Sequence, residues 1–179
     1  MSSYKLNNYS LVFELFIKQF NPKKIVEFGI LDGYSLDIFA KFSPPNTQIY
    51  AFDLFEDFIG NASEEKKIRE RFKLFPNVFI EKLDFLQSLP ILTKLGRIDL
   101  MHIDVANNGK IYEFAVKNIL PLCDFMILEG GSKDRDNVEW MKKYKKKSIH
   151  PFLDKLKLKT HNFYTIDQFP SLTIFYKVE

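Results

Sequence analysis

Residues 24–35 read KIVEFGILDGYS, and this stretch decides the fold of the chain. Its first five residues are too few and too rich in β-branched side chains for a helix, so they predict a short buried strand. Gly29 and Gly33 follow, and apolar residues at helical spacing then continue to Phe42. A strand that turns through glycines into a helix leaves backbone N–H groups facing open space. A carboxylate or phosphate can bind there with no Cβ in the way.

The spacing of the glycines indicates which ligand such a turn would hold. Gly33 stands four positions after Gly29, and Glu27 stands two positions before Gly29. The resulting pattern, E-x-G-x-x-x-G, is neither the dinucleotide fingerprint nor a phosphate-binding loop with its Lys-Ser/Thr pair. It resembles the first motif of the class I S-adenosylmethionine-dependent methyltransferases. A turn with a purely structural role explains two glycines equally well, so the rest of the chain must decide.

Composition sets the broad class of the protein. The chain has 179 residues, 46% apolar and 27% charged, which predicts one domain with a substantial core. The formal charge of +3 gives no global argument for nucleic acid. The single cysteine, Cys123, excludes an intramolecular disulfide, and its apolar neighbours predict a buried hydrophobic role. No signal peptide and no apolar run of about 18 residues is seen, so we expect a cytoplasmic protein without membrane contact.

Strand and helix patterns alternate along most of the chain. A helical stripe over residues 10–20 comes first, and the strands that follow are predicted at 24–28, 48–53, 78–82, 97–104 and 124–129. Strands that alternate with helices predict an α/β fold with a parallel sheet. The last two strands, 161–167 and 172–178, are joined by a loop too short for a crossover helix. This pair must therefore be an antiparallel hairpin.

Acidic residues stand at or near the carboxyl ends of five predicted strands, the edge where parallel sheets bind their ligands. They are Glu27, Asp53, Asp84, Asp104 and Glu129. Like charges gathered at one edge destabilise an empty site, so a positively charged ligand is indicated. A sulfonium cofactor with an ammonium group fits, and so does a divalent metal.

Two of these acids have specific predicted roles. Asp53 lies 20 residues after Gly33, where an acid of a nucleotide-binding unit accepts hydrogen bonds from both ribose hydroxyls. A turn cap at the strand end is the alternative for Asp53. Asp84 stands where it could accept a hydrogen bond from an adenine amino group, and capping of a short helix explains it equally well.

From about Ser10 to its end, the chain resembles a class I methyltransferase. The resemblance implies a Rossmann-like three-layer sandwich with a seven-stranded, mostly parallel sheet in the order 3-2-1-4-5-7-6 and an antiparallel last strand. It also implies a single domain over residues 1–179, with the helix at 10–20 as a cap. By position, Asp53 and Asp84 resemble the ribose and adenine acids of S-adenosylmethionine. The residues that correspond to those around its methionine portion are Glu27, Gly29, Gly33 and Ser35.

The segment IDVANN, residues 103–108, resembles the fourth-strand motif of a small-molecule O-methyltransferase branch. That branch often has Ile-Asp-Gly-Asp-His there, and its acids can bind a divalent metal. Asp104 is retained, but Asn107 and Asn108 stand at the positions of the acid and the histidine. We therefore predict no metal site. Magnesium held by oxygen atoms of Asp104, Asn108 and Glu129 stays open as the less favoured option.

The reaction implied is direct transfer of a methyl group to a substrate oxygen. Asp104 or Glu129 would act as the catalytic base that accepts the hydroxyl proton. His102 lies inside an apolar strand, so a buried and satisfied histidine is the preferred interpretation. Arg135 would orient an anionic or polyhydroxylated substrate, with a local ion pair to Asp136 as the alternative.

The predicted function is methylation of a small molecule, such as a sugar or another secondary metabolite, with a homodimer left open. One alternative is an RNA or protein methyltransferase that docks through the lysines of residues 142–159. Nucleic acid is disfavoured because the Asn-Pro-Pro-Tyr type of motif is missing. These lysines are better explained as a solvated helix face, with Trp140, Met141 and Tyr144 packed inward.

A non-enzymatic protein that keeps the fold is the other alternative. A nicotinamide oxidoreductase is least favoured because its glycine spacing and Tyr-x-x-x-Lys pair are absent.

Overall fold

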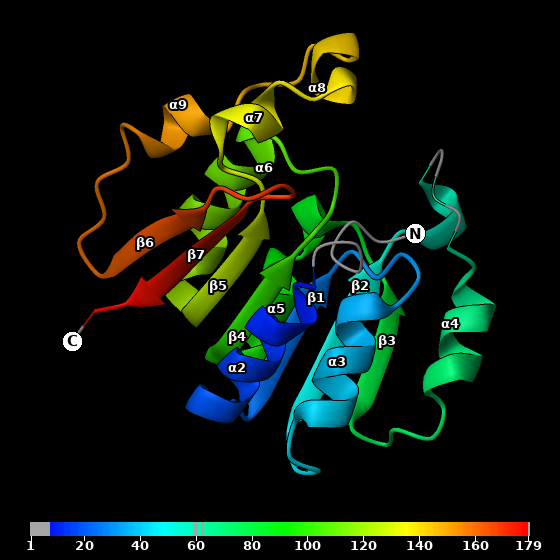
Figure 1. Cartoon of the computed structure of the whole chain (residues 1–179). Coiled ribbons are helices and arrows are strands. Elements are labelled where there is room, and N and C mark those ends of the chain that lie inside the picture. The colour runs from blue at the N-terminus through cyan, green and yellow to red at the C-terminus, as the bar shows by residue number, and fades with distance from the viewer. Residues whose placement is uncertain (1–7, 59–60, 62, 179) are drawn as a thin grey trace. The chain divides into compact units, whose positions relative to one another are not determined.

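A computed structural model describes residues 8–58, 61 and 63–178. The chain divides into two compact units, Met1–Ser88 and Leu89–Glu179, and each is described by itself. Their strands form one seven-stranded sheet in the order β3-β2-β1-β4-β5-β7-β6, which confirms the predicted order (Figure 1). Over the residues described, no helix has the length and apolar character needed to cross a membrane.

The first unit contains three parallel strands. β1 pairs with β2 in a register that aligns Lys24 with Gln48, and β2 pairs with β3 so that Ile49 aligns with Val78. Its main elements are α2 (Ser10–Phe20), β1 (Lys24–Phe28), α3 (Tyr34–Phe42), β2 (Gln48–Asp53), α4 (Glu65–Phe72) and β3 (Val78–Lys82). Short 3-10 turns follow β2 at Phe55–Asp57 and β3 at Phe85–Gln87.

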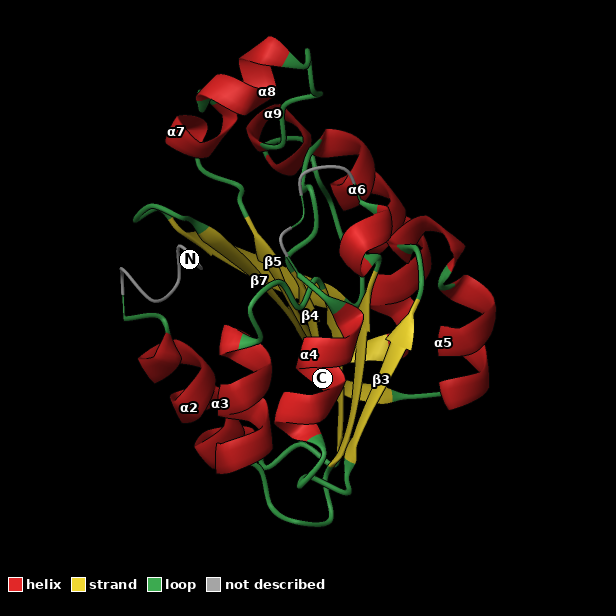
Figure 2. Cartoon of the chain, turned by 90° about the vertical axis from the view of Figure 1, so that its right-hand side faces the viewer, coloured by secondary structure: helices red, strands yellow, loops and turns green. Residues whose placement is uncertain are grey.

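Aromatic packing holds the core of this unit together. Phe28 on β1 stacks on Phe52 of β2 with ring centroids 4.9 Å apart, and Phe85 meets it edge-on at 5.1 Å. Helices α2 and α3 lie side by side (Figure 2), and Phe13 meets Phe39 edge-on at 5.4 Å between them. Such pairs stabilise a fold by about 0.5–1.5 kcal/mol beyond the apolar area that they bury. These phenylalanine pairs thus pack β1 against β2 and hold α2 against α3.

The second unit contains the antiparallel hairpin that the short loop predicted. β5 lies parallel to β4, and β7 is antiparallel to both β5 and β6. Its main elements are α5 (Leu89–Leu95), β4 (Ile98–Ile103), α6 (Gly109–Phe114), β5 (Cys123–Glu129), α7 (Lys133–Asp136), α8 (Glu139–Lys143), α9 (His150–Leu153), β6 (His161–Ile166) and β7 (Leu172–Lys177). α6 continues as a π-helical turn at Ala115–Ile119 and a 3-10 turn at Leu120–Leu122.

Burial confirms two side-chain predictions and corrects a third. His102 and Cys123 are buried, and desolvation by burial raises the pKa of the Cys123 thiol, so this cysteine stays protonated. The expectation that Tyr144 packs inward is wrong, because 61% of its surface is exposed. Helix α8 ends at Lys143, and Lys145 then adopts a left-handed backbone with φ 46°. Tyr144 therefore leaves the helical face that buries Met141.

Two glycines of this unit allow a matched test of packing. Gly131 has φ +114°, and a Cβ there would lie 2.1 Å from Thr173 Oγ1, whereas Gly96 has φ +73° with nothing within 4 Å of its Cβ position. Both alanine variants adopt an unfavourable positive φ, but only Gly131→Ala also forces buried atoms apart. We expect Gly131→Ala to lower the free energy of unfolding in urea by about 2–3 kcal/mol more than Gly96→Ala. Equal costs would contradict this packing.

Candidate functional site

The glycine turn lies between β1 and α3, as the sequence predicted. Gly29 and Gly33 have φ angles of 93° and 75°, and Leu31 between them also has a positive φ of 49°. The N–H of Gly29 donates to the carbonyl of Phe52 on β2 at 2.9 Å, and that of Gly33 donates to Ile30 at 2.7 Å. The turn is thus fastened to the neighbouring strand and folded tightly, in a conformation that favours glycine at both ends.

Asp53, the last residue of β2, organises this turn. Its Oδ2 accepts hydrogen bonds from the backbone N–H groups of Ile30 at 2.6 Å and Leu31 at 3.1 Å. Its Oδ1 accepts from the N–H of Phe55 at 2.6 Å and from Nδ2 of Asn61 at 3.0 Å. One buried carboxylate therefore holds the glycine turn and the segment after β2 together. The bond to Phe55 confirms the alternative that Asp53 caps a turn at the strand end, while its ribose contact stays a prediction. Nothing in the sequence indicated the contact with Asn61.

Glu27 and Ser35 also come together beneath the turn. Both side chains are buried, and Ser35 Oγ donates to Glu27 Oε1 at 2.5 Å. This contact joins the end of β1 to the first turn of α3. An acid is thereby fixed near the end of β1, two positions before Gly29.

Asp84 has the structural role that the sequence left open. It precedes the 3-10 turn at Phe85–Gln87, and its Oδ1 accepts from the N–H of Leu86 at 2.9 Å. The side chain is half-buried. The capping interpretation is thus confirmed, while the adenine contact stays a prediction.

In the second unit, Glu129 and Arg135 form a buried ion pair. They are 6% and 5% exposed, and the guanidinium donates from Nε and Nη2 to the two carboxylate oxygens, with Nη2 to Oε2 at 2.8 Å. The guanidinium carbon lies 5.0 Å from the ring centre of Trp140. Burial alone would lower the pKa of Arg135, but the hydrogen bond and charge of Glu129 and the charge of Asp104 outweigh it and raise the pKa. The arginine is therefore a fixed cation.

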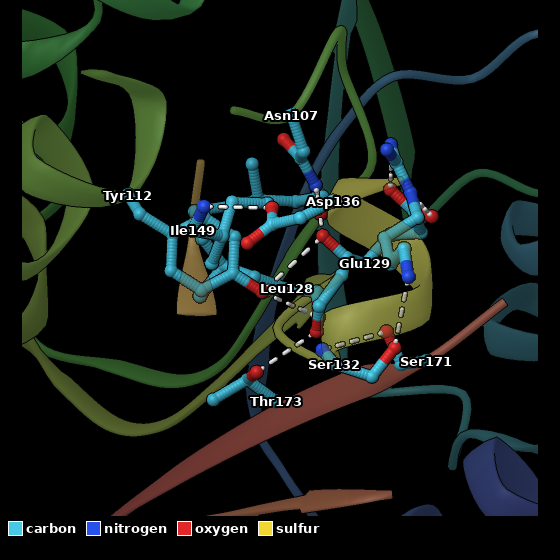
Figure 3. A network of polar contacts seen from close by, with 12 residues as sticks. Asn107, Tyr112, Leu128, Glu129, Ser132, Asp136, Ile149, Ser171 and Thr173 are labelled. Carbon is cyan, nitrogen blue, oxygen red and sulfur yellow. Dashed lines mark hydrogen bonds and ion pairs between the residues drawn. The ribbon is translucent and has the colours of Figure 1, made fainter. Parts of the chain in front are cut away.

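The backbone around Glu129 is held by a polar network (Figure 3). Asn107 Nδ2 donates to the carbonyls of Ile103 at 3.0 Å and Glu129 at 2.8 Å, which ties the end of β4 to the end of β5. The buried hydroxyl of Tyr112 lies between the carbonyls of Leu128 and Glu129, at 3.3 and 3.2 Å. Burial raises the pKa of Tyr112 well above its usual value, so this phenol remains a donor. The sequence placed Asn107 beside the site but not in this bridging role.

The alternative interpretation of Arg135, a local ion pair with Asp136, is wrong. Arg135 pairs with Glu129, whereas the carboxylate of Asp136 accepts the backbone N–H groups of Ile149 at 2.7 Å and His150 at 2.8 Å (Figure 3).

Asn108 caps α6 by accepting the N–H of Lys110 at 2.9 Å. Two of the three residues considered as magnesium ligands, Asn108 and Glu129, thus already accept hydrogen bonds from other protein groups. Across the described part of the chain, no group of three or more His, Cys, Asp or Glu residues is placed to hold a metal.

Asp104, the other predicted base, follows β4 and is half-buried. Of the predicted residues, the structure brings together Glu27 with Ser35, Asp53 with the glycine turn, and Glu129 with Arg135. Asn61, Asn107 and Trp140 join these groups without having been predicted there. Asn61 and Asn107 lie in loops, where neither spacing nor periodicity specifies a contact. Trp140 lies in α8, where helical spacing predicted inward packing but not its partner Arg135.

Comparison with known proteins gives fold-level matches. No protein-family model and no curated protein matches the sequence. The methyltransferase PaMTH1 of Podospora anserina, solved with SAH, is 16% identical with a TM-score of 0.73, over 100% of this chain and 80% of that one. A proposed caffeoyl-CoA O-methyltransferase from Staphylococcus aureus is 21% identical with a TM-score of 0.67, over 98% and 88%. The chain has the class I methyltransferase fold.

A proposed rRNA methylase from Clostridium thermocellum shares this methyltransferase fold at 15% identity and a TM-score of 0.64, over 100% of this chain and 97% of that one. The methyltransferase fold thus occurs in proteins named for small molecules and in proteins named for RNA. The fold alone does not choose between these acceptors.

Proposed function

We propose that this protein is an S-adenosylmethionine-dependent methyltransferase that acts on an oxygen of a small molecule. The observation that carries the proposal is the contact of Asp53 with the glycine turn, because it joins two separate sequence signals into one structure. The SAH bound to PaMTH1, a protein of the same fold, gives independent support. The acceptor class, a sugar or another hydroxylated metabolite, follows the resemblance of residues 103–108 to the small-molecule branch.

The residues of the first unit suit this cofactor chemically. Glu27 offers a buried carboxylate for the ammonium group. The backbone N–H groups of Gly29, Ile30, Leu31 and Gly33 already donate within the protein, so the carboxylate of the methionine portion needs other donors. Asp53 would accept from the ribose and Asp84 from the adenine side. When bound, the cofactor supplies an electrophilic methyl group. The chain supplies position, which can contribute about 7–11 kcal/mol when reacting groups are well aligned.

For removal of the hydroxyl proton, Asp104 and Glu129 are the two candidate acids. Both carboxylate oxygens of Glu129 already accept hydrogen bonds from Arg135, so a substrate proton would have to compete with a guanidinium. Asp104 is half-buried at the end of β4, and its carboxylate would accept the proton from an acceptor hydroxyl. Arg135 Nη1 is buried and has no hydrogen-bond partner among the described residues, so it can donate to a further oxygen of the acceptor.

Calorimetry tests this function. Wild-type protein should bind S-adenosylmethionine and S-adenosylhomocysteine with dissociation constants below about 1 mM, whereas NAD should not bind. Absence of binding of both sulfur compounds at millimolar concentration would contradict the proposal. Binding without turnover over a broad panel of hydroxylated acceptors would favour the non-enzymatic alternative.

The lysines of α8 and the turn after it test the RNA alternative. Lys142, Lys143, Lys145 and Lys146 are exposed, and no ion pair involves them within the described ranges. A variant with all four changed to glutamine should keep its free energy of unfolding within about 1 kcal/mol of wild type, because exposed positions contribute little. We expect neither protein to be retained on immobilised RNA at low salt. Salt-dependent retention that the variant loses would favour the RNA alternative.

A further inference from the structure

The carboxylate of Asp53 has little room left for a ligand. A carboxylate has about four lone-pair positions, and four donors already contact this one, two at each oxygen. The sequence predicted that Asp53 accepts from both ribose hydroxyls. In the structure, a ribose can be accepted only if an existing donor leaves or shares its position.

The four donors are not equally easy to displace. Three are backbone N–H groups, of Ile30 and Leu31 in the glycine turn and of Phe55 in the 3-10 turn after β2. Their release would require the main chain to move. The fourth is the side-chain amide of Asn61, at 3.0 Å from Oδ1. Rotation of the Asn61 side chain alone can break this hydrogen bond. It is therefore the easiest of the four hydrogen bonds to displace.

Asn61 is also held on its other side. Its Oδ1 accepts the N–H of Ser63 at 3.0 Å, which is the geometry of an Asx turn. The side chain is half-buried and bridges Asp53 to the chain segment that leads into α4. The amide is thus fixed at one of the two lone-pair positions of Oδ1.

We propose that the Asn61 amide occupies the ribose position of Asp53 and that the cofactor displaces it on binding. This inference rests on the proposed function, and it refines the expected recognition to one ribose hydroxyl at Oδ1 in place of Asn61. The displaced contact opposes binding, so Asn61 sets the affinity for cofactor. The bridge between Asp53 and Ser63 opens as the ribose enters.

Asn61→Ser isolates this effect. Serine can still accept from the N–H of Ser63, but it is too short to reach Asp53. S-adenosylhomocysteine should bind the variant about three- to tenfold more tightly than wild type, because it no longer displaces a hydrogen bond. The matched control is Asn77→Ser, which removes a hydrogen bond from Asn77 Nδ2 to the carbonyl of Thr47 at 2.8 Å and should leave affinity unchanged.

Analogues that lack one ribose hydroxyl sharpen the test. One of the two analogues, 2′-deoxy or 3′-deoxy S-adenosylhomocysteine, lacks the hydroxyl that binds Oδ1. For that analogue, Asn61→Ser should not increase the affinity, since the analogue cannot occupy the freed position. In wild-type protein, the side-chain NH₂ signals of Asn61 in NMR should exchange faster with solvent once S-adenosylhomocysteine is bound. This second readout needs no variant and so does not depend on its folding.

The outcomes separate the two proposals. If wild-type protein does not bind S-adenosylhomocysteine, the proposed function fails. If it binds but Asn61→Ser binds equally or more weakly, or if the Asn61 amide stays protected in the complex, the function survives and the displacement is wrong. Tighter binding by both Asn61→Ser and Asn77→Ser would also contradict it, because the effect would not be specific to Asp53.

Discussion

Arg135→Ala should destabilise the protein by about 3–5 kcal/mol, measured by urea unfolding, because it leaves the carboxylate of Glu129 buried without its partner. Glu129 is 6% exposed, and both of its oxygens accept from the guanidinium. The variant also removes the cation that lies 5.0 Å from the ring centre of Trp140.

Two further variants define the cause of that loss. Lys133→Ala, at an exposed position of the same helix, should change stability by less than about 0.5 kcal/mol. The double variant Glu129→Gln with Arg135→Met removes both charges and should recover a large part of the stability. A cost for Arg135→Ala below about 1 kcal/mol, or no recovery in the double variant, would contradict a buried ion pair at this place.

Asp53→Asn should weaken binding of S-adenosylhomocysteine at least about 100-fold. An amide has one acceptor oxygen and one NH₂ group, so in either orientation a donor replaces an acceptor. The change affects either the N–H groups of Ile30 and Leu31 at Oδ2 or the ribose hydroxyl at Oδ1. Hydrogen bonds to a charged group contribute about 1.5–3 kcal/mol each, and the loss of two corresponds to this factor or more.

Asp57→Asn is the matched control for this prediction. Asp57 lies four residues further along, is exposed, and pairs with Lys82 at 3.2 Å. We expect its dissociation constant to stay within about twofold of wild type, since exposed ion pairs contribute little. Binding by Asp53→Asn within tenfold of wild type would show that this carboxylate is not central to the site.

The sequence predicted the framework because the framework depends on local pattern. Residues 10–20 and 48–53 form a helix and a strand with the expected bounds. The hairpin of β6 and β7 followed from the length of one loop. Period and loop length are properties of neighbouring residues, so one sequence suffices to detect them.

The side-chain partners were harder to predict because they depend on loop geometry. Arg135 reaches Glu129 only through Gly130 and Gly131, whose φ angles of 107° and 114° set the direction of the chain into α7. The sequence alone suggested only Asp136, the adjacent acid, as an ion-pair partner of Arg135, and not Glu129. Asn61 likewise reaches Asp53 across a segment without periodicity, where spacing specifies no contact.

The most direct test of the account is a crystal structure of the wild-type protein with S-adenosylhomocysteine. We expect the compound against the glycine turn of residues 29–33, with a ribose hydroxyl donating to Asp53 and the amino group close to Glu27. A compound bound elsewhere on the molecule, or a ribose that makes no contact with Asp53, would contradict the central claim.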